Sequence, residues 1–166
     1  MNQQSSAVVI VMGVAGSGKT TIGRLLAAEL GWEFYDADDF HPPANVEKMR
    51  RGAPLDDEDR RPWLDALARV VREVLERGVG AVLACSALKE RYRERLLIDG
   101  RVHLVYLKGS ARLIRERLAR RRGHFMKPGM LDSQLAALEE PAPETHFDIT
   151  PDAPEVVAAI RARLRL

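Results

Sequence analysis

The sequence predicts an α/β protein in which a parallel sheet lies between two layers of helices. Short apolar runs rich in β-branched residues alternate along the chain with longer amphipathic segments. This alternation is typical of a parallel sheet, because each parallel strand needs a crossover before the next one, and the crossovers cover both faces. The chain has 166 residues, enough for one domain with its own core. We therefore expect residues 1–166 to form a single domain.

Five short runs are predicted strands, namely residues 7–12, 32–35, 79–85, 102–107 and 147–149. The first is a continuous apolar run, as expected for a strand that is buried on both faces. The third ends at Cys85, which we expect to be a buried core thiol, since a single cysteine cannot form an internal disulfide.

The segments between the strands have helical periodicity. Gly31 is expected to end the first helix, and Ser110 to cap the helix that follows the fourth strand. Asp59 is expected to cap the longest helix, with Pro62 in its first turn. The longest predicted helix follows Asp59 and carries an apolar stripe of Leu64, Leu67, Val71 and Val74. The other predicted helices are residues 19–30, 45–51, 87–97, 111–122, 132–140 and 154–165.

Composition narrows the classes of partner. There are 26 Lys and Arg against 24 Asp and Glu, a formal net charge of +2, which does not indicate a nucleic-acid surface and suits an anionic small molecule equally well. No apolar run approaches the roughly 20 residues that span a bilayer, and residues 1–6 lack the features of a signal peptide. We expect a cytoplasmic protein with no membrane or nucleic-acid partner.

A phosphate-binding motif follows the first strand. The segment GVAGSGKT, residues 13–20, matches the pattern GxxxxGK[ST] and is placed between a buried strand and a helix. In this arrangement backbone N–H groups turn toward a polyphosphate, Lys19 reaches the β and γ phosphates, and the Thr20 hydroxyl binds Mg²⁺. The motif predicts a P-loop nucleotide-binding fold that uses ATP and Mg²⁺. The predicted nucleotide-binding residues are Gly13, Val14, Ala15, Gly16, Ser17, Gly18, Lys19, Thr20 and Thr21.

A dinucleotide-binding fold is the rival interpretation, because an acid some twenty residues after a glycine loop can hold a ribose. The stretch from Gly16 reads GSGKTT, so Thr21 stands where the third glycine would be and Lys19 intrudes. These two residues disfavour the dinucleotide interpretation.

Three acids occur together in YDADDFHPP, residues 35–43. The third strand ends in ACSAL without an acid, and no guanine-reading NKxD string occurs, so the acids that follow the second strand must serve both the metal and the acceptor. Asp36 and Asp38 are two apart and are expected on one side of an extended chain. We expect Asp36 to support Mg²⁺ through water and Asp38 to point at the acceptor hydroxyl. Capping the next helix is the alternative role, and it suits Asp39 better.

Basic residues gather in RERLARRRGHFMK, residues 115–127. Arg117 and Arg121 are four apart, which predicts one helix face, beside a segment without periodicity. We expect a mobile lid over residues 121–132 that brings Arg121 to the transferring phosphoryl group, with His124 orienting it. The alternative is that these basic residues only interact favourably with the negative end of the helix dipole.

Three longer strings behind the phosphate motif resemble gluconokinase, a small ATP-dependent kinase of the P-loop superfamily related to shikimate and nucleoside monophosphate kinases. They are residues 41–64, 85–96 and 123–141, and the resemblance covers nearly the whole chain. It implies a three-layer P-loop fold with a five-stranded parallel sheet in the order 2-3-1-4-5, a lid and a homodimer. It also implies the reaction of ATP with D-gluconate to give ADP and 6-phospho-D-gluconate.

The resemblance also implies residue roles. Lys19, Asp38 and Arg121 would be catalytic, Arg117 would lie near adenine, and the acceptor would bind over residues 38–64. Two other activities stay open: phosphorylation of another small hydroxy acid, and nucleotide binding without turnover. The candidate acceptor-binding residues are Asp38, His41, Lys48, Arg60, Ser86, Lys89 and Arg93, and the candidate metal-binding residues are Thr20 and Asp36.

Overall fold

Five parallel strands form one sheet in the order β2-β3-β1-β4-β5, which confirms the predicted topology. The computed structural model describes residues 6–121 and 129–166, so most of the expected lid, including His124, lies outside the described residues. The strands are β1 (Val8–Met12), β2 (Glu33–Asp36), β3 (Ala81–Ala84), β4 (Val102–Lys108) and β5 (His146–Asp148).

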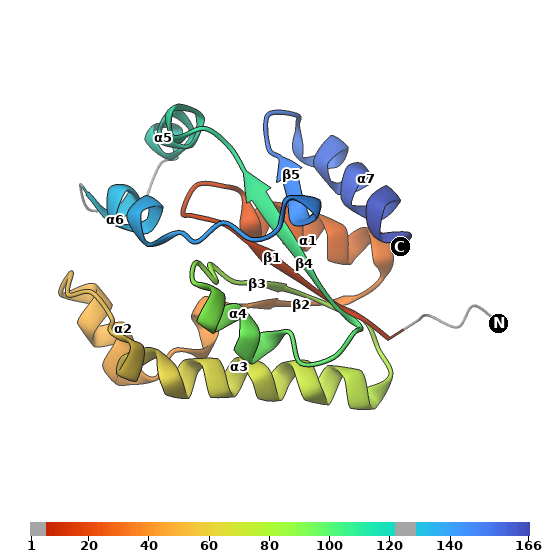
Figure 1. Cartoon of the computed structure of the whole chain (residues 1–166), viewed down its shortest axis with the longest axis horizontal. Helices are drawn as coiled ribbons and strands as arrows, with labels where there is room; N and C mark the ends of the chain where they lie inside the picture. The colour runs from red at the N-terminus through yellow and green to blue at the C-terminus, as the bar shows by residue number, and fades with distance from the viewer. Residues whose placement is uncertain (1–5, 122–128) are drawn as a thin grey trace.

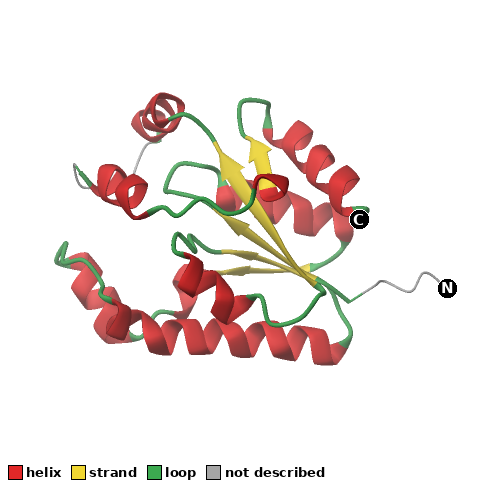
Figure 2. Ribbon diagram, viewed as in Figure 1, coloured by secondary structure: helices red, strands yellow, loops and turns green. Residues whose placement is uncertain are grey.

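Helices cover both faces of the sheet, with α3 and α4 on one face and α1 and α7 on the other (Figures 1 and 2). None of the helices in the described ranges is long and apolar enough to cross a membrane. The helices are α1 (Lys19–Leu30), α2 (Pro43–Arg50), α3 (Asp57–Arg77), α4 (Glu90–Leu96), α5 (Ala111–Arg120), α6 (Met130–Ala137) and α7 (Ala153–Leu164), with short 3₁₀ turns η1 (Ala37–Phe40) and η2 (Pro143–Thr145).

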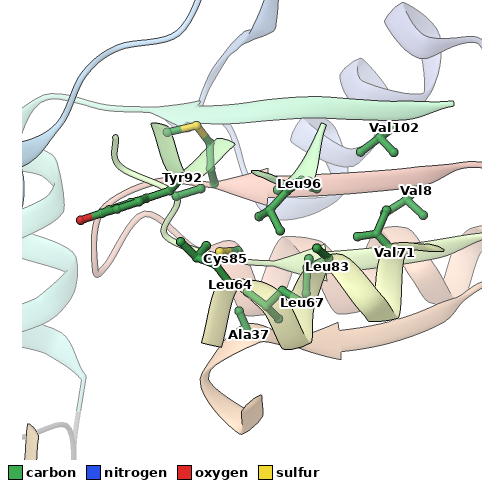
Figure 3. Close-up of a cluster of buried hydrophobic side chains, with 14 of the residues drawn as sticks. Val8, Ala37, Leu64, Leu67, Val71, Leu83, Cys85, Tyr92, Leu96 and Val102 are labelled. Carbon is green, nitrogen blue, oxygen red and sulfur yellow. The ribbon is translucent and has the colours of Figure 1, made fainter. Parts of the chain in front are cut away.

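The central strand is buried on both faces, as its continuous apolar sequence predicts. Val8 and Ile10 belong to the core beneath α3 and α4, whereas Val9 and Val11 belong to the core beneath α1 and α7. Figure 3 shows the first of these cores, where the side chains of α3 and α4 meet those of β1 and β3. Cys85 lies in this core, so its prediction as a buried thiol is confirmed.

Two predicted helix ends are confirmed. Gly31 takes the left-handed conformation after α1, with φ of 66°. Ser110 accepts a hydrogen bond from the Leu113 N–H at the start of α5. Both are local signals that depend only on residues within one turn, and tertiary packing does not override them here.

Two predicted helix starts are wrong. Helix α3 begins at Asp57 and is capped by Asp56, because Asp56 and Asp59 form a reciprocal capping box that extends the helix upstream. Pro62 consequently lies in the second turn of α3. Helix α4 begins at Glu90 instead of residue 87, because Ala87 has a φ of 45°, which is incompatible with a right-handed helix.

Gly80, just before β3, offers a test of core packing. A Cβ atom at this position would lie 2.2–2.5 Å from three ring atoms of Trp32, so Gly80→Ala forces the indole or the strand to move. We expect a loss of about 1–3 kcal/mol in the free energy of unfolding, measured by urea denaturation. Gly100→Ala is the matched control, because a Cβ there meets no atom within 4 Å. Equal stability of the two variants would contradict this packing.

Candidate active site

The phosphate loop, residues 13–20, joins β1 to α1 at the carboxyl end of the sheet (Figure 1). Gly16 and Gly18 have φ values of 82° and 95°, which favour glycine and allow the chain to wrap back on itself. Gly18 is the N-cap of α1, so the first-turn N–H groups of that helix face the loop without intrahelical acceptors. This is the geometry of an anion site, as the motif predicts.

Lys19 folds back over the loop, and its Nζ donates to the Val14 carbonyl at 3.1 Å. The pKa of the Lys19 amine is lowered, chiefly by burial, and the negative charges of Asp38 and Asp36 oppose this shift. The positive charge of Arg121 adds slightly to the lowering of this pKa. The amine is therefore held among charges of both signs at the mouth of the loop.

Asp36 ends β2, and its two carboxylate oxygens accept hydrogen bonds from two different segments. Its Oδ2 accepts from Thr20 Oγ1 at 3.2 Å, and its Oδ1 accepts from the Asp38 N–H at 3.0 Å. The second bond makes Asp36 the N-cap of the turn η1. The next helix, α2, has Pro42 as its N-cap and no side-chain cap, so the capping role suggested for Asp39 is wrong. The strand ends at Asp36, so the expected extended chain through Asp38 is wrong.

Asp38 is carried by the η1 turn and faces the same group of charges. Its carboxyl pKa is raised, first by loss of hydration and then by the negative charge of Asp36, while Lys19 and His41 oppose the shift. No hydrogen bond from residues 6–121 or 129–166 reaches its carboxylate oxygens. A carboxylate that has no hydrogen-bond partner among the described residues and a raised pKa is chemically suited to accept a proton.

The start of the acceptor segment, residues 38–64, is organised around Trp63. The indole Nε1 donates to the Ala37 carbonyl at 2.7 Å, which anchors the η1 turn to α3. The His41 ring stacks on the Trp63 ring with centroids 4.4 Å apart. Burial lowers the pKa of His41, and the positive charge of Arg60 adds to this shift while Asp38 opposes it. Trp63 is thus a core residue that also orients His41.

Arg60, on α3, is held by two hydrogen-bond partners. Its NH1 donates to the Leu55 carbonyl at 2.6 Å and to the Tyr92 hydroxyl at 3.2 Å. The Tyr92 hydroxyl in turn donates to Asp57 at 2.6 Å. Arg60 therefore has a fixed position with part of its guanidinium still available, which suits recognition of a carboxylate.

Two polar residues that the sequence did not single out support this segment. Asn45, on α2, donates to the Asp59 carbonyl at 2.7 Å and fixes α2 against α3. Tyr92 joins α4 to Arg60, as described above. Tyr92 belongs to one of the strings that carry the family resemblance, but no local pattern reveals a partner 32 positions away.

The other predicted acceptor residues are placed differently. Lys48 pairs with Asp59 at 2.6 Å and so is engaged within the segment. Ser86 and Lys89 are half-buried and lie in the turn between β3 and α4. The structure brings Asp36, Asp38, His41, Arg60 and Lys19 into one electrostatic group.

Arg93, another predicted acceptor residue, makes three hydrogen bonds to backbone carbonyls. Its NH1 donates to the carbonyls of Ala87 and Leu88, and its NH2 donates to the carbonyl of Glu139. The side chain is buried, and these three bonds use part of its guanidinium. The acceptor role of Arg93 stays a prediction. Arg93 also joins the β3–α4 turn to the segment that follows α6.

Arg117 and Arg121 do not share a helix face, which corrects the prediction. Helix α5 ends at Arg120, and Arg121 is extended, with ψ of 113°. Arg117 donates from NH2 to the Ile149 carbonyl at 2.5 Å and ties α5 to the chain after β5. Arg117 is therefore tied to the chain after β5, whereas Arg121 lies just beyond the end of α5.

A phosphate loop after the central strand, with an acid pair at the end of β2, defines a P-loop kinase for small molecules. Residues 15–150 match the family model described as Shikimate kinase. A gluconokinase from Gluconobacter oxydans is 52% identical over 134 residues, which cover 80% of this chain and 75% of that protein. A mouse protein named "Probable gluconokinase" is 44% identical over 98% of this chain and 100% of its own length.

The solved structures agree with this comparison. The crystal structure of a gluconokinase from Sinorhizobium meliloti 1021 superposes with a TM-score of 0.86 and 38% identity, covering 98% of this chain and 93% of that one. The chain belongs to the gluconokinase family, within the broader group that the shikimate kinase model describes.

Tyr92→Phe tests whether the Tyr92 hydroxyl positions Arg60. The variant removes one acceptor from Arg60 and leaves its bond to Leu55, so KM for the phosphoryl acceptor should rise about two- to tenfold, with kcat and KM for ATP nearly unchanged. Steady-state kinetics with each substrate varied would measure this. Tyr35→Phe is the matched control, because its hydroxyl bonds Glu33 on the sheet edge. A change in KM for ATP alone would reject the link to Arg60.

Proposed function

We propose that this protein phosphorylates D-gluconate at the 6-hydroxyl, with ATP as the phosphoryl donor and Mg²⁺ as the metal. The observation that carries the chemistry is the position of Asp38: its carboxylate accepts no hydrogen bond from the described residues, and its backbone N–H donates to Asp36, which also accepts from Thr20 of the phosphate loop. Gluconokinases at 38–52% identity over most of the chain support gluconate as the acceptor.

The nucleotide would bind along the phosphate loop. The loop N–H groups and Lys19 would hold the phosphates, and Arg117 would lie near the adenine. Thr20 and Asp36 fit a magnesium site, because a hydroxyl and a carboxylate already in contact are the oxygen ligands that Mg²⁺ prefers. Mg²⁺, when bound, would neutralise charge on the β and γ phosphates.

The residues of this chain would act mainly by position and charge, since phosphoryl transfer leaves little covalent chemistry to the protein. Asp38 would orient the primary hydroxyl of the acceptor and take its proton as the new bond to phosphorus forms. Lys19 and Arg121 would stabilise the negative charge on the transferring group. The proton leaves the acceptor oxygen for the Asp38 carboxylate, and the bond to the ADP oxygen breaks.

The acceptor would lie against residues 38–64 and the β3–α4 turn. Arg60 would bind the gluconate carboxylate, because it has a fixed guanidinium within the charge group around Asp38. His41, Lys48, Ser86 and Lys89 would contact the hydroxyl groups or the carboxylate.

A related kinase for another hydroxy acid is the alternative, and the comparisons do not favour it, because relatives at 38–52% identity over most of the chain are named gluconokinases. The same phosphate loop and acid would serve either acceptor. We further propose a homodimer, as the resemblance to gluconokinases implies, and a cytoplasmic location, where ATP is available. Sedimentation velocity would test the dimer.

A panel of acceptors tests the proposed function. ADP release should be fast with D-gluconate and slow with shikimate, other sugar acids and nucleoside monophosphates. Asp38→Asn should lower kcat by about 10²- to 10⁴-fold with ATP affinity little changed, because the base is lost and the loop is not. Asp39→Asn, one residue along, is the matched control and should stay active.

Two outcomes would contradict these assignments separately. Fast turnover of another acid with gluconate inert would reject the substrate and leave the phosphoryl-transfer chemistry in place. Near-normal kcat in Asp38→Asn would remove Asp38 from its role as the base.

A further inference from the structure

The tip of the phosphate loop is held by a side chain from a distant helix. The Ala15 N–H donates to Oε1 of Gln134 on α6 at 2.7 Å, across 119 positions of sequence. The Ser17 N–H donates to the Val14 carbonyl at 3.1 Å, so residues 14–17 form a turn with Ala15 and Gly16 at its centre. The φ of 82° at Gly16 is that of a type II turn, whose own bond leaves the Ala15 N–H free. Gln134 supplies the acceptor for this N–H.

The same turn places the amine of Lys19. The Val14 carbonyl that closes the turn also accepts from Lys19 Nζ at 3.1 Å. Because Gln134 fixes the turn and the turn fixes this carbonyl, the position of the amine depends on Gln134. On the other side, Gly16 packs so closely against Leu118 that a Cβ would lie 2.6 Å from it, which limits movement of the turn toward α5.

Helix α6 gives Gln134 a fixed base. Leu131 is buried in the core beneath α1 and α7, and Asp132 pairs with Arg115 of α5 at 2.6 Å. Beyond the helix, the Glu139 N–H donates to the Leu88 carbonyl at 2.8 Å. Arg93 donates to the Glu139 carbonyl, as described above. The segment from α6 to Glu139 is therefore fixed to α5 at one end and to the β3–α4 turn at the other.

We propose that Gln134 is a positioning residue for phosphoryl transfer, which sets the turn at residues 14–17 and through it the Lys19 amine. Its side chain acts through the loop and is not required to touch the acceptor. The proposal rests on the ATP use proposed above but not on the identity of the acceptor.

Gln134→Met tests this role, because methionine keeps the length of the side chain and lacks the amide oxygen. In the nucleotide-free variant the Ala15 amide should exchange its hydrogen about three- to tenfold faster, as expected for the loss of one hydrogen bond. Affinity for a non-hydrolysable ATP analogue and kcat/KM for ATP should fall by a similar factor, while KM for the acceptor stays unchanged.

Two further variants make the test specific. Ser133→Ala, an exposed change on the same helix, should leave all these quantities unchanged. Gln134→Glu keeps an acceptor oxygen at the same reach and should preserve the slow exchange of the Ala15 amide.

Several results would overturn the proposal. Unchanged exchange at Ala15 in Gln134→Met would show that the bond does not hold the turn, even if ATP affinity falls. Unchanged ATP affinity with faster exchange would show that the bond has no functional effect. Equal losses for ATP and the acceptor, with a lower melting temperature, would indicate general damage instead of positioning.

If the wild-type chain fails with gluconate while Gln134→Met shows the predicted losses, the substrate is wrong and the positioning role stands.

Discussion

The carboxylate of Asp36 connects the two halves of the site. One oxygen accepts from Thr20 in the phosphate loop, and the other accepts from the N–H of Asp38. Sheet register makes this possible, because Ala84 of β3 pairs with Asp36 on one side and with Val11 of β1 on the other. The strand ends are therefore level, and the proposed metal site and the proposed base lie on either side of a single side chain.

This arrangement brings charged groups together at a cost in stability. Loss of hydration and then the charge of Asp36 raise the pKa of Asp38, and burial lowers the pKa of Lys19. Each shift disfavours the charged form in the free protein, so the site is not optimised for stability. A polyphosphate and an acceptor hydroxyl would supply the partners that these groups lack. Contacts at the edge of the site, such as Gln134 with Ala15 and Tyr92 with Arg60, hold the groups in place meanwhile.

The parts of the site that were predictable from sequence are local. The phosphate loop and the caps at Gly31 and Ser110 depend on residues within a few positions of each other. What the sequence did not indicate involves either a partner far along the chain or a neighbouring residue that forms a competing cap. Spacing alone placed Asp38 on an extended chain, whereas the cap at Asp36 bends the chain into a turn. No local pattern indicated that the Arg93 guanidinium would donate to the carbonyl of Glu139, 46 positions away.

The structure of the ternary complex with a non-hydrolysable ATP analogue, Mg²⁺ and D-gluconate is the most direct measurement. We expect a carboxylate oxygen of Asp38 within about 2.6–3.2 Å of the gluconate 6-hydroxyl, with that hydroxyl facing the terminal phosphate. A complex in which the gluconate carboxylate faces the phosphate, or in which Asp38 points away from the 6-hydroxyl, would contradict the proposed chemistry.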